Sequence, residues 1–119
     1  MVESIVSKKA SAFALRIVRM RQYLTETAAK KEFVMSKQVL RSGTSVGANI
    51  EEALRGQSRA DFVSKMNISL KEACETRYWL KLLADSQYID KESAKSIMED
   101  CDELIRILKS IVKTTNEKK

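Results

Sequence analysis

The near absence of helix-breaking residues is the strongest constraint on how this chain can fold. Its 119 residues include no proline and only three glycines. Both residue types destabilise helix interiors, so a chain that avoids them favours long helices joined by short connections. A chain of this length forms one domain with its own hydrophobic core. The composition therefore predicts a single all-α domain over residues 1–119.

Apolar residues repeat at steps of three and four in four separate segments. The stripe of the first segment consists of Val6, Ala10, Phe13, Ile17, Met20 and Leu24. Such spacing places the apolar side chains on one helical face, and near-parallel helices can bury these faces together. The four stripes predict helices at roughly residues 3–29, 32–55, 59–85 and 91–114. Because the connections are short, we expect an antiparallel up-and-down four-helix bundle.

Three of the expected helix boundaries carry capping signals. Gly56 follows the second stripe, at a place where a glycine with positive φ commonly ends a helix. Ser58, with Asp61 three residues later, predicts the N-cap and acidic first turn of the third helix. Asp90 predicts the N-cap of the fourth helix.

Two glycines, Gly43 and Gly47, lie inside the second expected helix, one turn apart. Each costs about 1 kcal/mol relative to alanine in a helix, so tight packing must compensate. We interpret them as a site of close approach between helices. A phosphate-binding glycine loop is disfavoured, because no strand precedes these residues and no Gly-Lys-Ser/Thr sequence follows them.

The third expected helix has a second apolar face, and the first helix has apolar residues outside its core stripe. The apolar members of this candidate interface are Leu15, Val18, Ile68, Trp79 and Leu82, and Glu72 and Glu75 lie on the same face of the third helix. A helix central to its own bundle can be apolar all round. Alternatively, these residues form an interface between copies of the chain, where tryptophan is a preferred anchor. We favour self-association, with the two glutamates pairing with arginines of a neighbouring subunit, such as Arg41, Arg55 or Arg59.

The net charge of +6 is concentrated near the start of the chain. Residues 1–31 carry seven lysines and arginines against two acidic residues. The candidate nucleic-acid contacts are Lys8, Lys9, Arg16 and Arg19 in the first helix and Lys109 and Lys113 in the fourth. We expect the two helices to join into one basic patch that contacts phosphates in a salt-sensitive way. A solvated helix face that keeps the protein soluble is the competing interpretation.

The sequence predicts no catalytic residue, metal ligand or cofactor. Histidine, the commonest general base and metal ligand, is absent, which excludes the Glu-x-x-His motifs of di-iron bundles. Cys74 and Cys101 form no zinc signature and are predicted to be small buried hydrophobes. No apolar run approaches the roughly 20 residues that span a bilayer, and no signal peptide begins the chain. These features predict a cytoplasmic protein without a membrane partner.

Two blocks of the sequence match the pattern of a known family. The first block contains Arg41, Ser45, Val46, Asn49, Ile50, Glu52 and Ala53. The later block contains Asp61, Phe62, Ala73, Glu75, Thr76, Tyr78, Trp79 and Leu80. Over the last two-thirds of its length, the chain resembles the bacterial S23, or 23S rRNA intervening-sequence, proteins. These are related to the accessory variability protein of diversity-generating retroelements.

The resemblance implies a four-helix bundle that assembles into a homopentameric barrel, with no known catalysis and a role with nucleic acid. We therefore expect a non-enzymatic oligomeric scaffold whose partners are further copies of itself and the backbone of RNA or DNA. Two alternatives remain open. One is a structural adaptor whose partner is another protein, and the other is a metal enzyme that uses carboxylates alone.

Overall fold

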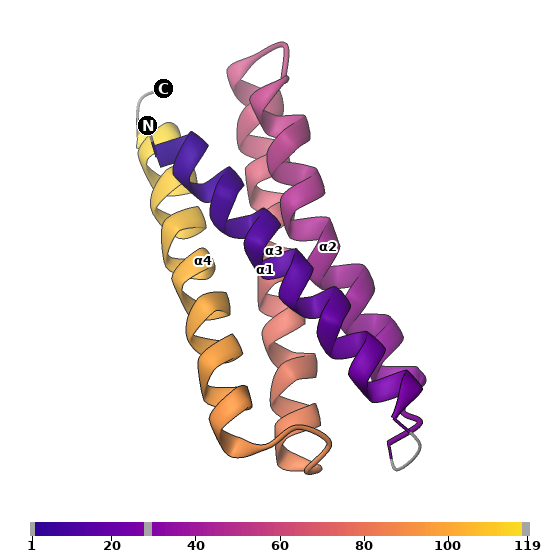
Figure 1. Cartoon of the computed structure of the whole chain (residues 1–119). Helices are drawn as coiled ribbons and strands as arrows, with labels where there is room; N and C mark the ends of the chain where they lie inside the picture. Colours follow the sequence, from indigo (N-terminus) through magenta and orange to yellow (C-terminus); the bar gives the residue numbers. More distant parts are fainter. Residues whose placement is uncertain (1, 28–29, 118–119) are drawn as a thin grey trace.

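The computed structural model describes residues 2–27 and 30–117, which form four helices and no strand. The helices are α1 (Val2–Glu26), α2 (Val34–Leu54), α3 (Arg59–Asp85) and α4 (Lys91–Glu117). They run alternately up and down in an elongated body of 52 × 21 × 20 Å (Figure 1). The predicted all-α four-helix bundle is confirmed. Helix α2 packs between α1 and α3, whereas α4 packs on α3 and contacts α1 less extensively.

The apolar stripes of the four helices meet in one core. Its largest fully buried side chains include Phe13, Ile17, Leu24, Ile50, Met66, Leu80, Leu83, Leu104 and Leu108. Cys101 belongs to this core, and burial raises the pKa of its thiol to about 12. Cys74 is exposed, so the prediction that both cysteines are buried is wrong for this one. Ala73 occupies the core position of that turn, and the next residue is rotated about 100° away from it.

The connection between α1 and α2 differs from the expected boundaries. Helix α1 ends at Glu26 rather than at position 29, and positions 28 and 29 lie outside the described residues. Lys31, at φ 46°, turns the chain back, and the Glu32 N–H donates to the Leu24 carbonyl at 2.8 Å. One of the last carbonyls of α1 is thus satisfied by the returning chain instead of by another helical turn.

Helix α2 begins at Val34 rather than at position 32 because a glutamate caps it from outside. The buried Glu32 carboxylate accepts the backbone N–H groups of Val34 and Met35 at 3.2 Å each and of Ser36 at 2.7 Å. These are donors of the first turn that have no partner within the helix. An anionic cap at this position also interacts favourably with the helix dipole.

The predicted caps of α3 and α4 are present, whereas the predicted conformation of Gly56 is wrong. Ser58 accepts the Asp61 N–H at 3.1 Å, and Asp90 accepts the Ser93 N–H at 2.8 Å. No described glycine has a positive φ. A Cβ at Gly56 would instead lie 2.9 Å from the Asp61 carboxylate and 3.1 Å from the Ala53 carbonyl oxygen, so a side chain would crowd the tight turn between α2 and α3.

Both ends of α3 and the start of α4 lie where expected, and three other helix ends shift by one to three residues, with α1 beginning at Val2 rather than at 3. Helix α2 ends at Leu54 rather than at 55, and Arg55 is its C-cap residue. Helix α4 continues to Glu117 rather than ending at 114. The Thr115 hydroxyl donates to the Ile111 carbonyl at 2.8 Å within this extra turn.

Small residues in the middle of α2 face two different helices. A Cβ at Gly43 would lie 3.0 Å from Cγ1 of Ile17 in α1, whereas a Cβ at Gly47 would lie at an ordinary 3.7 Å from Cβ of Ala10. On the other side, the buried Ser42 hydroxyl accepts a hydrogen bond from Thr76 of α3 at 2.8 Å. The short side chains therefore let α2 approach both neighbouring helices closely.

Candidate functional site

The four candidate cations of α1 divide into paired and unpaired residues. Lys9 Nζ lies 3.2 Å from Glu103 Oε1, and Arg16 Nη1 lies 2.5 Å from Asp100 Oδ2. These ion pairs join α1 to α4, and because their side chains are more than a third exposed, each contributes no more than about 1 kcal/mol. Lys8 is exposed and makes no ion pair within residues 2–27 and 30–117. The same holds for the exposed Arg19.

The candidate cations of α4 lie on the opposite flank of that helix. Asp102 accepts a hydrogen bond from Arg77 of α3 at 2.6 Å, so its side of α4 faces α3. Lys109 is seven residues further along, on the same helical face, and Lys113 follows one turn later. Both lysines are exposed and unpaired in the described part of the chain. Residues 104–116 contain no acidic residue, so every charged side chain in this half of α4 is basic.

The structure does not bring the basic residues of α1 and α4 into one continuous patch. Asp100 and Glu103 lie on the α1 side of α4, where they neutralise Arg16 and Lys9. Two of the α1 cations are thus paired with acidic residues of α4, whereas Lys109 and Lys113 lie on the flank of α4 toward α3. The sequence contains all of these charges, but only the helix orientations decide which of them meet.

The two glutamates of the candidate interface find their partner within the same chain. Arg41 of α2 donates to Glu72 at 3.1 Å and also pairs with Glu75 of α3. The Trp79 indole N–H donates to Glu75 at 3.2 Å. This indole contact and the Arg41 guanidinium together lower the pKa of Glu75. These glutamates therefore have a cationic partner within the single chain, and an arginine from a neighbouring subunit is not needed to satisfy them.

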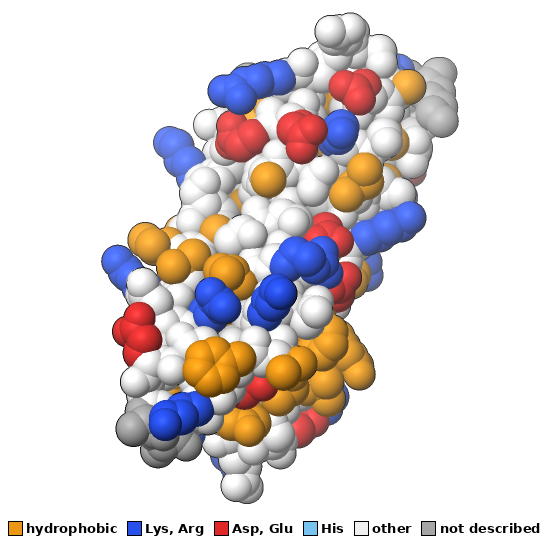
Figure 2. Space-filling model, turned by 90° about the vertical axis from the view of Figure 1, so that its right-hand side faces the viewer, with side chains coloured by type: hydrophobic (Ala, Val, Ile, Leu, Met, Phe, Trp, Pro, Cys, Tyr) orange, Lys and Arg blue, Asp and Glu red, His pale blue; other side chains and the backbone are white. Residues whose placement is uncertain are grey.

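The apolar residues of the candidate interface are partly exposed on α1 and α3. Ile68 of α3 is 40% exposed and Leu15 of α1 is 49% exposed, while Val18, Trp79 and Leu82 are half-buried. Helix α2 lies between the α1 and α3 members of this set. Figure 2 looks onto the side of the molecule that carries α2, and apolar side chains gather toward its lower end.

Two exposed apolar residues that the sequence reasoning missed lie at the start of α2, and one of them, Val34, extends this face. Val34 is 74% exposed and Phe33 is 55% exposed. Val34 precedes Arg41 by seven residues and Leu82 follows Glu75 by seven, so in the antiparallel pair they lie at the same level. The signal in the sequence was an apolar pair at a helix start, outside the core stripe. We call Leu15, Val18, Val34, Ile68, Trp79 and Leu82 the α2-side apolar face.

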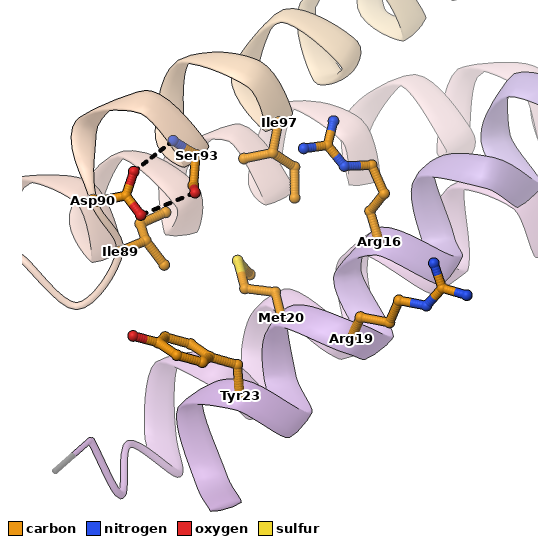
Figure 3. Close-up of a pocket in the computed structure, with 8 residues that line it drawn as sticks. All are labelled: Arg16, Arg19, Met20, Tyr23, Ile89, Asp90, Ser93 and Ile97. Atoms are coloured by element: carbon orange, nitrogen blue, oxygen red, sulfur yellow. Dashed lines mark hydrogen bonds between the residues drawn. The ribbon is translucent and has the colours of Figure 1, made fainter. Parts of the chain in front are cut away.

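An open cleft separates the last turns of α1 from the first turns of α4. Helix α1 begins beside the end of α4 and crosses the bundle at an angle, so the two helices diverge toward the other end (Figure 1). The cleft has a volume of about 440 Å³, and Met20, Ile89 and Ile97 form its apolar floor. Figure 3 shows Tyr23 and Asp90 at one end and Arg16 toward the other.

The described residues contain no group of three or more cysteine and acidic side chains that could hold a metal ion. In that same part of the chain, none of the helices combines the length and apolarity that crossing a membrane requires.

Comparison with known proteins relates this chain to one family. The profile of the 23S rRNA-intervening sequence protein family matches residues 2–110. The chain is also similar to a crystal structure from Bacteroides thetaiotaomicron VPI-5482, described as a protein with unknown function from the S23 ribosomal protein family. The identity is 53% and the TM-score 0.91, over 95% of this chain and 99% of the other. No curated protein matches the chain.

Proposed function

This chain belongs to the 23S rRNA-intervening sequence protein family, and from that premise we propose that it is a cytoplasmic, non-enzymatic scaffold. In this proposal, copies of the chain assemble into a homopentamer through the α2-side apolar face. The assembly binds the sugar-phosphate backbone of RNA or DNA through its unpaired cations. The family is one of unknown function, so both activities are tested below.

The observation that supports self-association is the exposure of the α2-side apolar face. Ile68, Leu15 and Val34 each leave 40% or more of their surface in contact with water in the single chain. Apolar side chains grouped on one face of a polar protein usually mark a contact with another molecule. The face also includes Trp79, a residue type preferred at the centre of interfaces. A second subunit on this face would remove these side chains from water.

Light scattering tests the assembly directly. We expect a mass of five times 13.5 kDa for the wild type. Trp79→Asp places a charge in the α2-side apolar face and is expected to release monomers. Ser110→Asp, which adds the same charge to an exposed site on α4, serves as the control and is expected to keep the pentamer. A monomeric wild type would refute self-association, and an intact Trp79→Asp pentamer would refute the assignment of the interface.

The observation that supports nucleic-acid binding is the set of cations that lack an acidic partner. Lys8 and Arg19 on α1 and Lys109 and Lys113 on α4 are exposed and unpaired among the described residues. A cation already engaged in an ion pair gains less from a phosphate, because the new contact replaces an existing one. Assembly into an oligomer would multiply the weak phosphate contacts of each copy.

Titration of labelled RNA and DNA across a range of salt concentrations tests this function. Backbone binding predicts that affinity falls steeply with salt and depends little on sequence. Lys109→Glu/Lys113→Glu is expected to weaken binding and flatten the salt dependence. Lys9→Gln, which removes a cation that is already paired with Glu103, is expected to have a smaller effect. No binding at low salt would overturn the proposal and favour an adaptor with a protein partner.

A further inference from the structure

The cleft between α1 and α4 carries a combination of groups that binding along a phosphate backbone does not use. Its floor is apolar and belongs to the hydrophobic core, because Ile89 and Ile97 are only 7% and 4% exposed. Its volume of about 440 Å³ lies within the range of small-ligand sites. The cleft is thus large enough for one planar ring system with a polar substituent.

An exposed aromatic ring stands at the edge of this cleft. Tyr23 is 50% exposed, although it lies beside the half-buried Met20 (Figure 3). The Lys30 ammonium lies 5.9 Å from the centroid of the Tyr23 ring. Exposed aromatic rings next to cations are the platform on which nucleic-acid-binding proteins stack unpaired bases.

The charges around the cleft are arranged with opposite signs at opposite ends. Arg19 lines the cleft and is exposed and unpaired in the described residues, although its guanidinium is directed away from Ile97 in Figure 3. Arg16, one turn earlier, extends toward Ile97 but already pairs with Asp100, so Arg19 is the cation left for a ligand. At the other end, the exposed Asp90 accepts the Ser93 backbone N–H at 2.8 Å and the Ser93 hydroxyl at 3.0 Å. A carboxylate retains lone pairs beyond these two bonds, so Asp90 remains an acceptor for a ligand N–H group.

From this geometry we propose that the cleft binds one nucleotide unit, with its base stacked on Tyr23 and its phosphate next to Arg19. Asp90 then accepts a hydrogen bond from an N–H group of the base. A fatty acid would match the floor and the arginines but has no donor for Asp90. An acidic peptide would bring a like charge toward Asp90. The nucleotide unit satisfies the floor, the ring and both charged ends.

This inference rests on the proposed nucleic-acid function and makes it more specific. A base within a duplex is already stacked and paired, so only an unpaired base can enter the cleft. The unpaired cations outside the cleft would contact either form of nucleic acid through phosphates. Single strands therefore gain a contact at Tyr23 that duplexes cannot make.

Anisotropy titrations of one RNA sequence, as a single strand and as a duplex, test the stacking contact. Tyr23→Leu is expected to weaken single-strand binding about 5- to 100-fold and to leave duplex binding unchanged. Tyr78→Leu is the matched control, because Tyr78 is also exposed, at 57%, but lies on α3. Thermal unfolding of both variants checks that they fold. Equal single-strand affinities for the wild type and Tyr23→Leu would overturn the proposal.

A second arm separates the cleft from the backbone function and identifies the source of the nucleotide. Adenosine monophosphate and ribose 5-phosphate are titrated separately while the NMR signals of Tyr23 and Ile97 are followed. Shifts caused only by the base-containing ligand support the proposal even if RNA binding fails. Shifts with single-stranded RNA but not with the mononucleotide assign the cleft to a base within a strand. Equal NMR shifts with adenosine monophosphate and ribose 5-phosphate, or no shifts with any nucleotide, would overturn the proposal. Shifts caused only by an acidic peptide would also overturn it.

Discussion

Replacing Gly43 by alanine tests the close approach of α1 and α2 quantitatively. The added Cβ would lie 3.0 Å from Cγ1 and 3.1 Å from Cγ2 of Ile17. Ile17 is fully buried and β-branched, so a rotation that clears one methyl brings another toward the new Cβ. Overpacking of this kind costs about 1–3 kcal/mol, and the better helix propensity of alanine returns about 1 kcal/mol. We expect the variant to lose up to about 2 kcal/mol of unfolding free energy.

The matched control for this experiment is the same substitution one turn later. A Cβ at Gly47 would meet Ala10 at 3.7 Å, an ordinary van der Waals distance. Gly47→Ala is therefore expected to gain up to about 1 kcal/mol from helix propensity alone. In urea denaturation followed by circular dichroism, the unfolding free energy of Gly43→Ala should lie below that of the wild type and that of Gly47→Ala above it. Equal protein concentrations are needed, because self-association makes apparent stability concentration-dependent. If Gly43→Ala is as stable as Gly47→Ala, the close approach described here is wrong.

Three further measurements test other contacts. A thiol reagent is expected to label Cys74 in the folded chain and Cys101 only after denaturation, because burial raises the pKa of Cys101 to about 12; equal labelling rates would contradict this. Thr76→Val should cost about 1–3 kcal/mol by leaving the buried Ser42 hydroxyl without its partner, and a double-mutant cycle with Ser42→Ala should be non-additive. The contacts that lower the pKa of Glu75 stabilise the folded state at pH values above 4.5, the ordinary pKa of a glutamate. This stabilisation is lost as the pH falls through the lowered pKa of Glu75. Emission of the single tryptophan should therefore titrate below pH 4.5, and Glu75→Gln should abolish this titration.

The helices and their buried faces were predictable from the sequence because they depend on local properties. A three-four spacing of apolar residues places them on one side of a helix regardless of what packs there. The caps at Ser58 and Asp90 involve residues three positions apart, so they were also predictable. The α1–α2 connection was not, because Glu32 acts there as a cap through its side chain. The N-cap residue itself is Phe33, which is not one of the usual capping residues and makes no side-chain cap hydrogen bond.

The functional surfaces depended on which flank of each helix meets which neighbour. The sequence identified Glu72 and Glu75 as a pair in need of a cation, but only the antiparallel packing of α2 on α3 places Arg41 of the same chain opposite them. It identified the cations of α1 and α4, but helix orientation decides that Lys9 and Arg16 pair with acidic residues of α4. Such contacts join residues more than thirty positions apart, and no local pattern specifies them.

The sequence alone thus determined an all-α chain with four amphipathic helices, since composition and periodicity act within a few turns. The tertiary structure decided the pairing of the charges, the extent of the α2-side apolar face and the cleft beside Tyr23. The cleft exists because α1 crosses the bundle at an angle, packing closely on α2 while diverging from α4. A crossing angle results from how the side chains of two surfaces fit together, which is a property of the assembled bundle.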